Sequence, residues 1–265
     1  MPRVRPALPA LLLAGLLLFA WAGPLLRTTD PDALDLAATL APASAAHPLG
    51  TDESGRDILA RLMAGGRVSL AVGALASGVA LLLGTLIGAL AAWRGGRLDA
   101  LLMRLTDAAM AVPVLFVALA VLSLYGSRVA LLIGVIGATS WPGVARLVRA
   151  EVAALRQADF VHAARGLGGR GERVVLRHLL PQLAPTLTVA ASLGVAYAML
   201  TESALSFLGL GVQPPQASWG NMLNGAQASL YTAPRLAIWP GVMILLTTLA
   251  CNGLGEALRR RSTNH

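Results

Sequence analysis

The chain has 265 residues, of which 56% are hydrophobic and only 13% are charged, roughly half the charged fraction of an ordinary soluble domain. The net charge of +8 does not indicate nucleic-acid binding, because the arginines lie in separate clusters between apolar runs and the sequence contains no lysine. The single cysteine, Cys251, excludes an intramolecular disulfide and a cysteine-rich metal site. We therefore expect a protein of the lipid bilayer.

Six segments are apolar enough to cross a bilayer as helices, each crossing needing about 20 mostly apolar residues. They are Ala7–Leu26, Val68–Trp93, Leu105–Leu124, Val129–Ala145, Leu183–Leu208 and Leu236–Leu254. Small residues in the second segment permit close backbone approach between helices in lipid, and they include Gly73, Gly78, Gly84 and Gly88. We predict an all-α membrane protein with six transmembrane helices packed as a bundle.

Arginine clusters indicate which connections face the cytoplasm. They precede the first segment, fill the second and fourth connections, and end the chain: Arg3 and Arg5; Arg94, Arg97 and Arg104; Arg146 to Arg177; and Arg259 to Arg261. The loop from Arg27 to Arg67 mixes arginines with acidic residues and is expected outside. With six spans, both the N-terminus and the C-terminus are then cytoplasmic.

The first apolar segment has a second interpretation, because Arg3, Arg5 and the Ala-Trp-Ala sequence ending at Ala22 imitate a cleavable signal peptide. The apolar run continues to Leu26 and favours retention as an anchor. No repeat or linker divides the chain. We expect an N-terminal helix and outer loop over 1–66, one membrane domain over 67–256, and a cytoplasmic tail over 257–265.

The longest connection expected in the cytoplasm runs from Arg146 to Pro181 and carries two apolar stripes at helical spacing. The stripes are Phe160, Val161, Ala164 and Leu167, then Val174, Val175, His178 and Leu179, with glycines at 166, 168, 169 and 171 between them. This pattern predicts two short amphipathic helices joined by a glycine turn. Such a pair inserts into a groove on a partner protein, and the alternative is a helix lying flat on anionic lipid.

This connection resembles the cytoplasmic loop of the permease subunits of ABC importers. That loop reads Glu-Ala-Ala, three residues, Gly, nine residues, Ile, one residue, Leu-Pro, and the chain has Ala163, Ala164, Gly168, Leu180 and Pro181 at this spacing. His162 replaces the Glu, with Asp159 one turn earlier as a substitute charge. His178 replaces the Ile, which is similar to the peptide-importer branch, where Arg-His-Ile-Leu-Pro is common.

Four further segments resemble the second permease of dipeptide, oligopeptide and nickel importers: His47–Leu70, Trp141–Glu151, Ser206–Pro215 and Ser218–Leu223. The resemblance implies a type I ABC importer permease fold in the bacterial inner membrane. It implies a second permease subunit, two cytoplasmic ABC ATPases and an extracytoplasmic solute-binding protein as partners. It also implies that the chain is not an enzyme and binds no cofactor, since ATP and magnesium belong to the ATPases.

Two acidic residues, Asp107 and Glu202, lie within predicted spans, where an ionisable group usually faces the bundle interior or a water-filled path. Asp107 is expected beside Arg104 at the cytoplasmic interface. Glu202 either lines the pathway or pairs across helices, and we favour pairing. Pro113 and Pro142 are expected to kink their helices.

Other classes of function fit the sequence less well. An intramembrane hydrolase needs a nucleophile motif such as GxSxG, and the histidines lack metal-site spacing. ATPase activity of the chain itself is excluded because the phosphate-binding loop requires a lysine. The hypothesis of an ATP-independent channel does not explain the helical pattern of the loop from Arg146 to Pro181. Dipeptides, longer peptides and chelated nickel all remain open as the solute.

Overall fold

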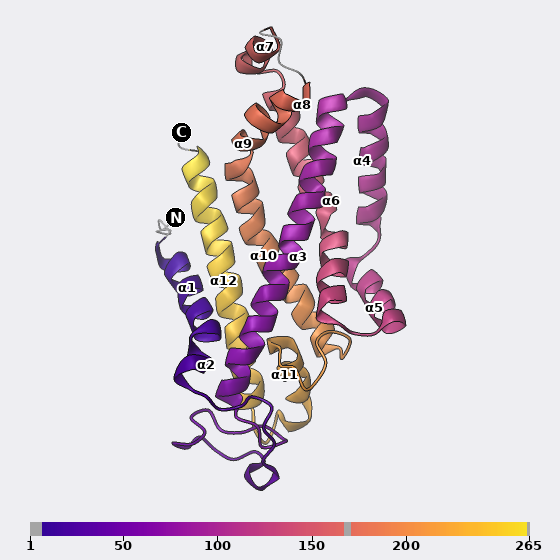
Figure 1. Cartoon of the computed structure of the whole chain (residues 1–265). Helices are drawn as coiled ribbons and strands as arrows, with labels where there is room; N and C mark the ends of the chain where they lie inside the picture. The colour runs from indigo at the N-terminus through magenta and orange to yellow at the C-terminus, as the bar shows by residue number, and fades with distance from the viewer. Residues whose placement is uncertain (1–6, 167–170, 264–265) are drawn as a thin grey trace.

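The computed structural model describes residues 7–166 and 171–263, and the regular elements of these residues are helical apart from an isolated bridge between Thr51 and Asp57. The helices are α1 (Ala7–Trp21), α2 (Gly23–Leu26), α3 (Ile58–Arg94), α4 (Gly96–Ala111), α5 (Val114–Tyr125), α6 (Val129–Leu155), α7 (Asp159–Gly166), α8 (Gly171–Val174), α9 (Leu180–Gln182), α10 (Ala184–Phe207), α11 (Trp219–Gly225) and α12 (Arg235–Thr263) (Figure 1). Short turns over Leu36–Ala38 (η1), Val175–Leu179 (η2) and Gln227–Ser229 (η3) complete the set.

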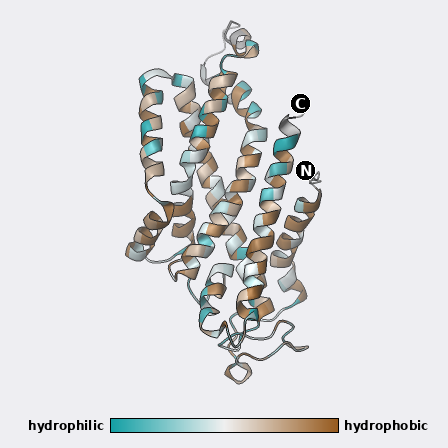
Figure 2. Cartoon of the chain, turned by 180° about the vertical axis from the view of Figure 1, so that it is seen from behind, coloured by the Kyte–Doolittle hydropathy of each residue, from teal (hydrophilic) through white to brown (hydrophobic). Residues whose placement is uncertain are grey.

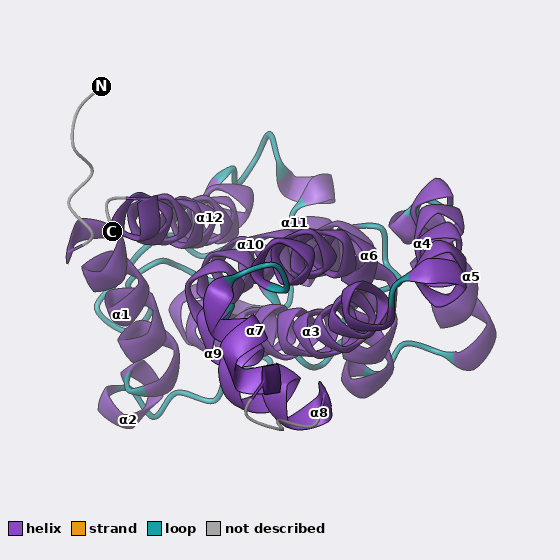
Figure 3. Ribbon diagram, turned by 90° about the horizontal axis from the view of Figure 1, so that it is seen from above, coloured by secondary structure: helices purple, strands orange, loops and turns teal. Residues whose placement is uncertain are grey.

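Three long helices, α3, α6 and α10, form the centre of the molecule (Figure 3). Helices α1 and α12 lie on one side of them, and α4 and α5 lie on the other. Helices α7 to α9 extend from one end of the bundle, hereafter the α7 end, whereas α11 and the loop between α2 and α3 lie at the opposite end, hereafter the α11 end (Figure 1). The two ends therefore carry different structures.

Four helices are long and apolar enough to cross a membrane: α3, α6, α10 and α12. The pair α4 and α5 makes a fifth apolar stretch, bent by 76° at its break. Helix α1 is apolar but has 15 residues, which at 1.5 Å per residue reach about 22 Å, short of the roughly 30 Å of a bilayer core. The structure thus supports four or five of the six predicted spans by length and composition.

The third predicted span, Leu105–Leu124, is not one straight helix, because the chain breaks between α4 and α5. Pro113 has no N–H to donate and disfavours helical geometry at the residue before it. Val112 accordingly adopts an extended conformation, with φ −93° and ψ 120°. The expected kink at Pro113 is confirmed as a full break, whereas Pro142 lies inside the continuous helix α6.

Helix α3 begins at Ile58, ten residues before the predicted start at Val68, because Asp57 provides a strong N-cap. Its carboxylate accepts a hydrogen bond from the Ala60 N–H at 2.8 Å. The same buried carboxylate lies 2.9 Å from both Arg27 Nη2 and His47 Nδ1. These contacts tie the preceding loop to the start of α3, so part of the segment expected to be loop is helix.

Glycines allow α3 and α6 to approach closely. A Cβ at Gly88 would lie 2.3 Å from the Ala145 carbonyl oxygen, and a Cβ at Gly84 would lie 2.8 Å from that of Trp141. Gly73 similarly faces α10, at 3.1 Å from the Val195 carbonyl oxygen. Three of the four glycines predicted to permit helix contact therefore do so, whereas Gly78 faces open space.

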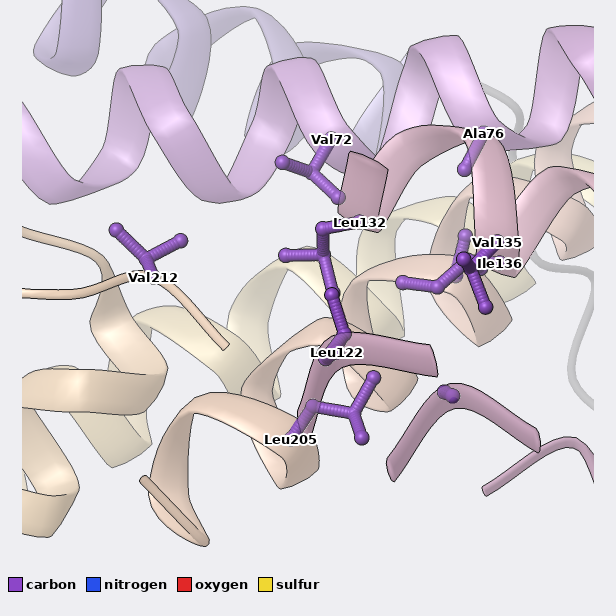
Figure 4. Close-up of a cluster of buried hydrophobic side chains, with 10 residues drawn as sticks. Val72, Ala76, Leu122, Leu132, Val135, Ile136, Leu205 and Val212 are labelled. Carbon is purple, nitrogen blue, oxygen red and sulfur yellow. The ribbon is translucent and has the colours of Figure 1, made fainter. Parts of the chain in front are cut away.

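A buried apolar cluster joins the centre of the bundle to α5 and to the loop after α10 (Figure 4). Its larger members are Val72 on α3, Leu122 on α5, Leu132 and Ile136 on α6, and Leu205 on α10. Figure 2 shows that hydrophobic residues cover most of α1 and α5, whereas hydrophilic residues gather on α4 and at the C-terminal end of α12. The apolar outer surface is suited to lipid or to a partner bundle.

The glycine contacts give a first prediction. Gly88→Ala should lower the thermal unfolding temperature of the detergent-purified chain, because the new methyl group forces α3 away from the Ala145 carbonyl at a cost of about 1–3 kcal/mol. Gly78→Ala is the matched control on the same helix, and it should leave the temperature unchanged or raise it, since alanine favours helix. Equal shifts for the two variants would contradict the packing argument.

Candidate coupling segment and membrane cavity

The predicted coupling residues lie at the α7 end, in the segment 159–182, hereafter the coupling segment (Figure 1). Helix α7 forms before the glycine-rich sequence, and α8, η2 and α9 follow it, so helices lie on both sides of that sequence as the spacing predicts. Gly168 falls outside the described residues. The backbones of His162 and Ala164 belong to α7, while their side chains lie outside the described part of the structure.

One face of the coupling segment packs on the ends of α3 and α6. Val161, Val174 and Leu179 are fully buried there. They form a cluster with Leu183 and with residues of the two long helices, namely Ala89, Ala92, Val148 and Val152. Part of each predicted apolar stripe is therefore used inside the chain and is not free to enter a partner's groove.

Trp93 fixes the junction between α3 and the coupling segment. The Arg156 guanidinium lies 5.9 Å from the centre of the indole ring, within the range of a cation–π contact. Arg156 Nη1 also donates a hydrogen bond to the Ala92 carbonyl at 3.1 Å. On the other side, a Cβ at Gly171 would lie 3.1 Å from the indole nitrogen, so a larger residue at this position would push α8 away.

Pro181 explains the change of helix type before α9. Proline cannot donate to the carbonyl of the residue four positions earlier, Arg177. The chain adopts π-helical geometry over Val175–Leu179, and the Leu180 N–H bonds to the Val175 carbonyl, five residues earlier. This wider turn places His178 on the exposed side and Leu179 on the buried side.

The remaining predicted coupling residues lie mainly on the outward face of the segment. Asp159, Ala163 and His178 are exposed, and Leu180 is half-buried. Phe160, beside them, is 40% exposed although it is a large aromatic residue. This outward face carries apolar groups and, with Arg173 and Arg177, positively charged ones.

Ion pairs attach α4 to α6. Arg149 and Asp99 form a two-pronged contact, with Nε–Oδ1 and Nη2–Oδ2 distances of 2.5 Å each. One helical turn from Arg149, Arg146 donates to Asp107. The carboxylate of Asp107 thus pairs with an arginine of α6, and Arg104 lies three residues earlier on its own helix. Because both side chains are about half exposed, this pair contributes little stability.

A cavity of about 540 Å³ lies among α3, the break between α4 and α5, α6 and α10. Small and apolar residues form most of its wall, with polar groups from Ser77, Thr139, Ser140 and Tyr197. The Ser140 hydroxyl oxygen is buried and has no hydrogen-bond partner among the described residues. The Ser77 and Thr139 hydroxyls already donate to the Ala191 and Val135 carbonyls, so the cavity combines apolar walls with sparse hydroxyl groups.

Glu202 does not line this cavity. Its side chain is fully buried between α10 and α3, where it accepts a hydrogen bond from Ser69 Oγ at 3.0 Å. This geometry corresponds to a contact between helices. The function of Glu202, like that of Asp107 and of the coupling residues, stays a prediction.

The packing of the coupling segment gives a second prediction. Leu179→Asp should free the segment from α3 and α6, because an unpaired charge is costly to bury. Trypsin should then cut after Arg173 about tenfold faster in the purified chain, and cleavage is measured at this bond because neither variant changes a residue next to it. His178→Asp is the control, since it adds the same charge at an exposed neighbour. Similar cleavage of both variants would show that the apolar cluster does not hold the segment.

Known proteins resemble the chain over most of its length. Residues 84–263 match the family described as "Binding-protein-dependent transport system inner membrane component". The chain is 42% identical over 258 residues to a putative peptide permease protein of Brucella suis biovar 1 (strain 1330), covering 96% of this chain and 85% of that protein.

Two further relatives have other named solutes. A glutathione transport system permease protein of Pectobacterium atrosepticum is 40% identical over 216 residues, covering 82% of this chain and 72% of that protein. A nickel transport system permease protein of Escherichia coli (strain K12) is 39% identical over 236 residues, covering 89% of this chain and 85% of that protein. The chain therefore belongs to the family of binding-protein-dependent transport system inner membrane components, the permeases of ABC importers.

Proposed function

We propose that the chain forms half of a pathway that carries di- or oligopeptides across the inner membrane. The observation that carries this proposal is the membrane cavity, whose wall combines small apolar residues with hydroxyl groups. A peptide presents N–H and C=O groups together with varied side chains, so sparse hydroxyls in an apolar wall contact its backbone without selecting its sequence. The family membership supports transport as the activity.

We infer six crossings, with α1 and α2 as the first and α4 and α5 together as the third. Helix α1 runs toward the α11 end and α12 returns from it (Figure 1), which fits both termini in the cytoplasm. The arginine-rich α7 end is then cytoplasmic. The proposed division is an N-terminal helix and outer loop over 1–66, the permease domain over 67–256, and a cytoplasmic tail over 257–265.

We further propose that the outward face of the coupling segment binds a cytoplasmic ATPase. Phe160 supplies an apolar anchor, and Arg173, Arg177 and His178 supply donors around it. ATP and magnesium bind the two ATPase subunits and not this chain. A second permease subunit completes the pathway, and an extracytoplasmic solute-binding protein delivers the solute to the α11 end.

Nickel is the alternative solute, because a nickel transport permease is among the relatives. The cavity favours a peptide, since the described residues contain no group of three or more His, Cys, Asp or Glu side chains able to hold a metal ion. An ATP-independent channel is a distant alternative, which the patterned coupling segment disfavours.

Reconstitution of the whole complex in proteoliposomes tests the proposed function. ATP is supplied on the side of the membrane where the ATPases lie. We then expect uptake of a labelled dipeptide or oligopeptide and no uptake of nickel. Mass spectrometry of what the co-purified binding protein holds gives an independent answer. Nickel uptake with no peptide uptake would replace the proposed solute, and uptake without ATP would favour a channel.

Filling the cavity gives a third prediction. Gly143 lines the cavity, and a Cβ added there would meet no atom within 4 Å, so the side chain of Gly143→Trp can leave the helix toward the cavity and should occupy its space. We expect peptide uptake to fall at least about tenfold while the complex still assembles. Gly134→Trp is the matched control, because Gly134 lies on the same helix with open space around it but outside the cavity. Equal uptake by both variants would remove the cavity from the pathway.

The glycine turn gives a fourth prediction. Gly168→Trp should leave the subunit inserted while transport collapses, because a bulky residue in the turn prevents both flanking helices from seating together on the ATPase. Uptake and ATP hydrolysis are measured in the full complex at equal expression. A segment that merely rests on lipid predicts little change, so wild-type uptake would remove the coupling role from Ala163, Ala164, Gly168, Leu180 and Pro181.

A further inference from the structure

The carboxyl group of Glu202 is a buried ionisable group that neither the cavity nor the coupling segment uses. Its Oε2 accepts a hydrogen bond from Ser69 Oγ at 3.0 Å and a weaker one from Ser203 Oγ at 3.3 Å, and its Oε1 accepts from Ser206 Oγ at 2.7 Å. Ser218 also lies beside it. Serine hydroxyls are thus its hydrogen-bond donors among the described residues.

Two of these serines also accept hydrogen bonds from backbone amides of the chain segment that follows α10. Ser69 Oγ accepts a hydrogen bond from the Trp219 N–H at 3.2 Å, at the start of α11. Ser206 Oγ accepts from the Val212 N–H at 2.9 Å. A serine hydroxyl has one hydrogen, and because the carboxylate takes it, the lone pairs of each oxygen face the backbone amides. Glu202 therefore orients both serines as acceptors.

The segment held in this way runs from 208 to 226 and is hereafter the outer segment. It is seated closely on α3 and α10, since a Cβ at Gly220 would lie 2.6 Å from Ser203 Cα and one at Gly65 would lie 3.1 Å from the Ser218 carbonyl carbon. The Trp219 side chain is fully buried, and its indole N–H donates to the Leu62 carbonyl at 3.0 Å. The contact is tight enough that the outer segment cannot tilt without breaking it.

Moving the outer segment away from α3 and α10 would break these hydrogen bonds and packing contacts together. Two backbone amides would lose their acceptors, and the hydroxyls around Glu202 would become free to turn away from it. Because the carboxylate is buried, each hydrogen bond to it is stronger than the same bond in water, and the bonds of the network strengthen one another. Such a network favours two discrete positions over gradual movement.

We propose that Glu202, Ser69 and Ser206 form a latch that positions the outer segment and keeps the α11 end of the bundle closed. Glu202 is a positioning residue in this proposal, because it lies outside the cavity and acts on the outer segment through Ser69 and Ser206 and through its contact with Ser218, which belongs to that segment. The role of the latch in transport rests on the proposed function, because a transport pathway needs an end that opens and closes. The latch itself is a property of the chain.

Cysteine labelling tests the latch without reference to transport. Ala217 lies in the outer segment and is 4% exposed, so Ala217→Cys in a Cys251→Ser background makes a protected thiol. The full complex is purified in detergent and treated with a maleimide. Ser69→Ala, Ser206→Ala and Glu202→Gln should each raise the labelling rate about tenfold, because each removes a serine donor or one of the two carboxylate acceptors and so frees the outer segment.

Ser203→Ala is the matched control. Ser203 also donates to Glu202, but within the described part of the chain its hydroxyl makes no hydrogen bond to the outer segment, so its loss should change labelling less than about twofold. If the Ser203 variant matches the Ser206 variant, the serines merely satisfy a buried charge and the latch is overturned. Unchanged labelling in the Ser69 and Ser206 variants overturns it as well.

Uptake by Glu202→Gln separates the latch from the proposed function. A positioning residue predicts a lower maximal uptake rate at an unchanged half-saturating solute concentration, whereas a changed half-saturating concentration with protected labelling would place Glu202 in contact with solute and overturn the latch. If no peptide is carried by any variant, including the unmodified complex, the labelling results still decide the latch, and only the proposed function fails.

Discussion

The close contact between α3 and α6 determines how the rest of the molecule is arranged. In a bilayer no hydrophobic effect presses helices together, so contact must come from close packing of their surfaces. Gly84 and Gly88 on α3 and Gly137 on α6 bring the two backbones within distances that any side chain would prevent. The coupling segment then packs on the joined ends of these helices, and α4 and α5 attach along α6. The cavity remains on the side where α10 meets them.

Much of this fold follows from local pattern. Helix α10 lies within one residue of its predicted bounds, because an apolar run and Pro185 near its start define it without help from elsewhere. The start of α3 could not be predicted in the same way, since Asp57 caps the helix within a network that includes Arg27 and His47 from distant positions. Similarly, Pro113 predicts a break in the third span, but the 76° bend depends on how α5 packs against α6.

In the candidate site, too, some features follow from the local sequence pattern and others depend on residues that are distant in the sequence. The spacing of the coupling motif predicts helices on both sides of the turn, yet it does not distinguish Phe160, which is partly exposed, from the neighbouring Val161, which is buried. That difference is set by the ends of α3 and α6. Ser69 and Ser140 were missed altogether, because a single hydroxyl in an apolar run has no periodic signal. The sequence feature that points to such a serine is an acid within a predicted span, here Glu202. A buried carboxyl group requires hydrogen-bond donors, and another helix can supply them.

Helix α3 connects the three sites that the structure reveals. Its 37 residues span about 55 Å as a helix. Ala92 contacts the coupling segment, Ser77 lines the cavity, and Ser69 takes part in the contact with Glu202. A helix is stiff along its axis because each turn is hydrogen-bonded to the next, so a displacement imposed at one end reaches the other. Since α10 carries Glu202 and follows directly from α9, the coupling role and the latch that we propose would place both sides of the Ser69–Glu202 contact on helices that touch the coupling segment. Relative movement of α3 and α10 would therefore strain the tightly seated outer segment while it reshapes the cavity between the same two helices.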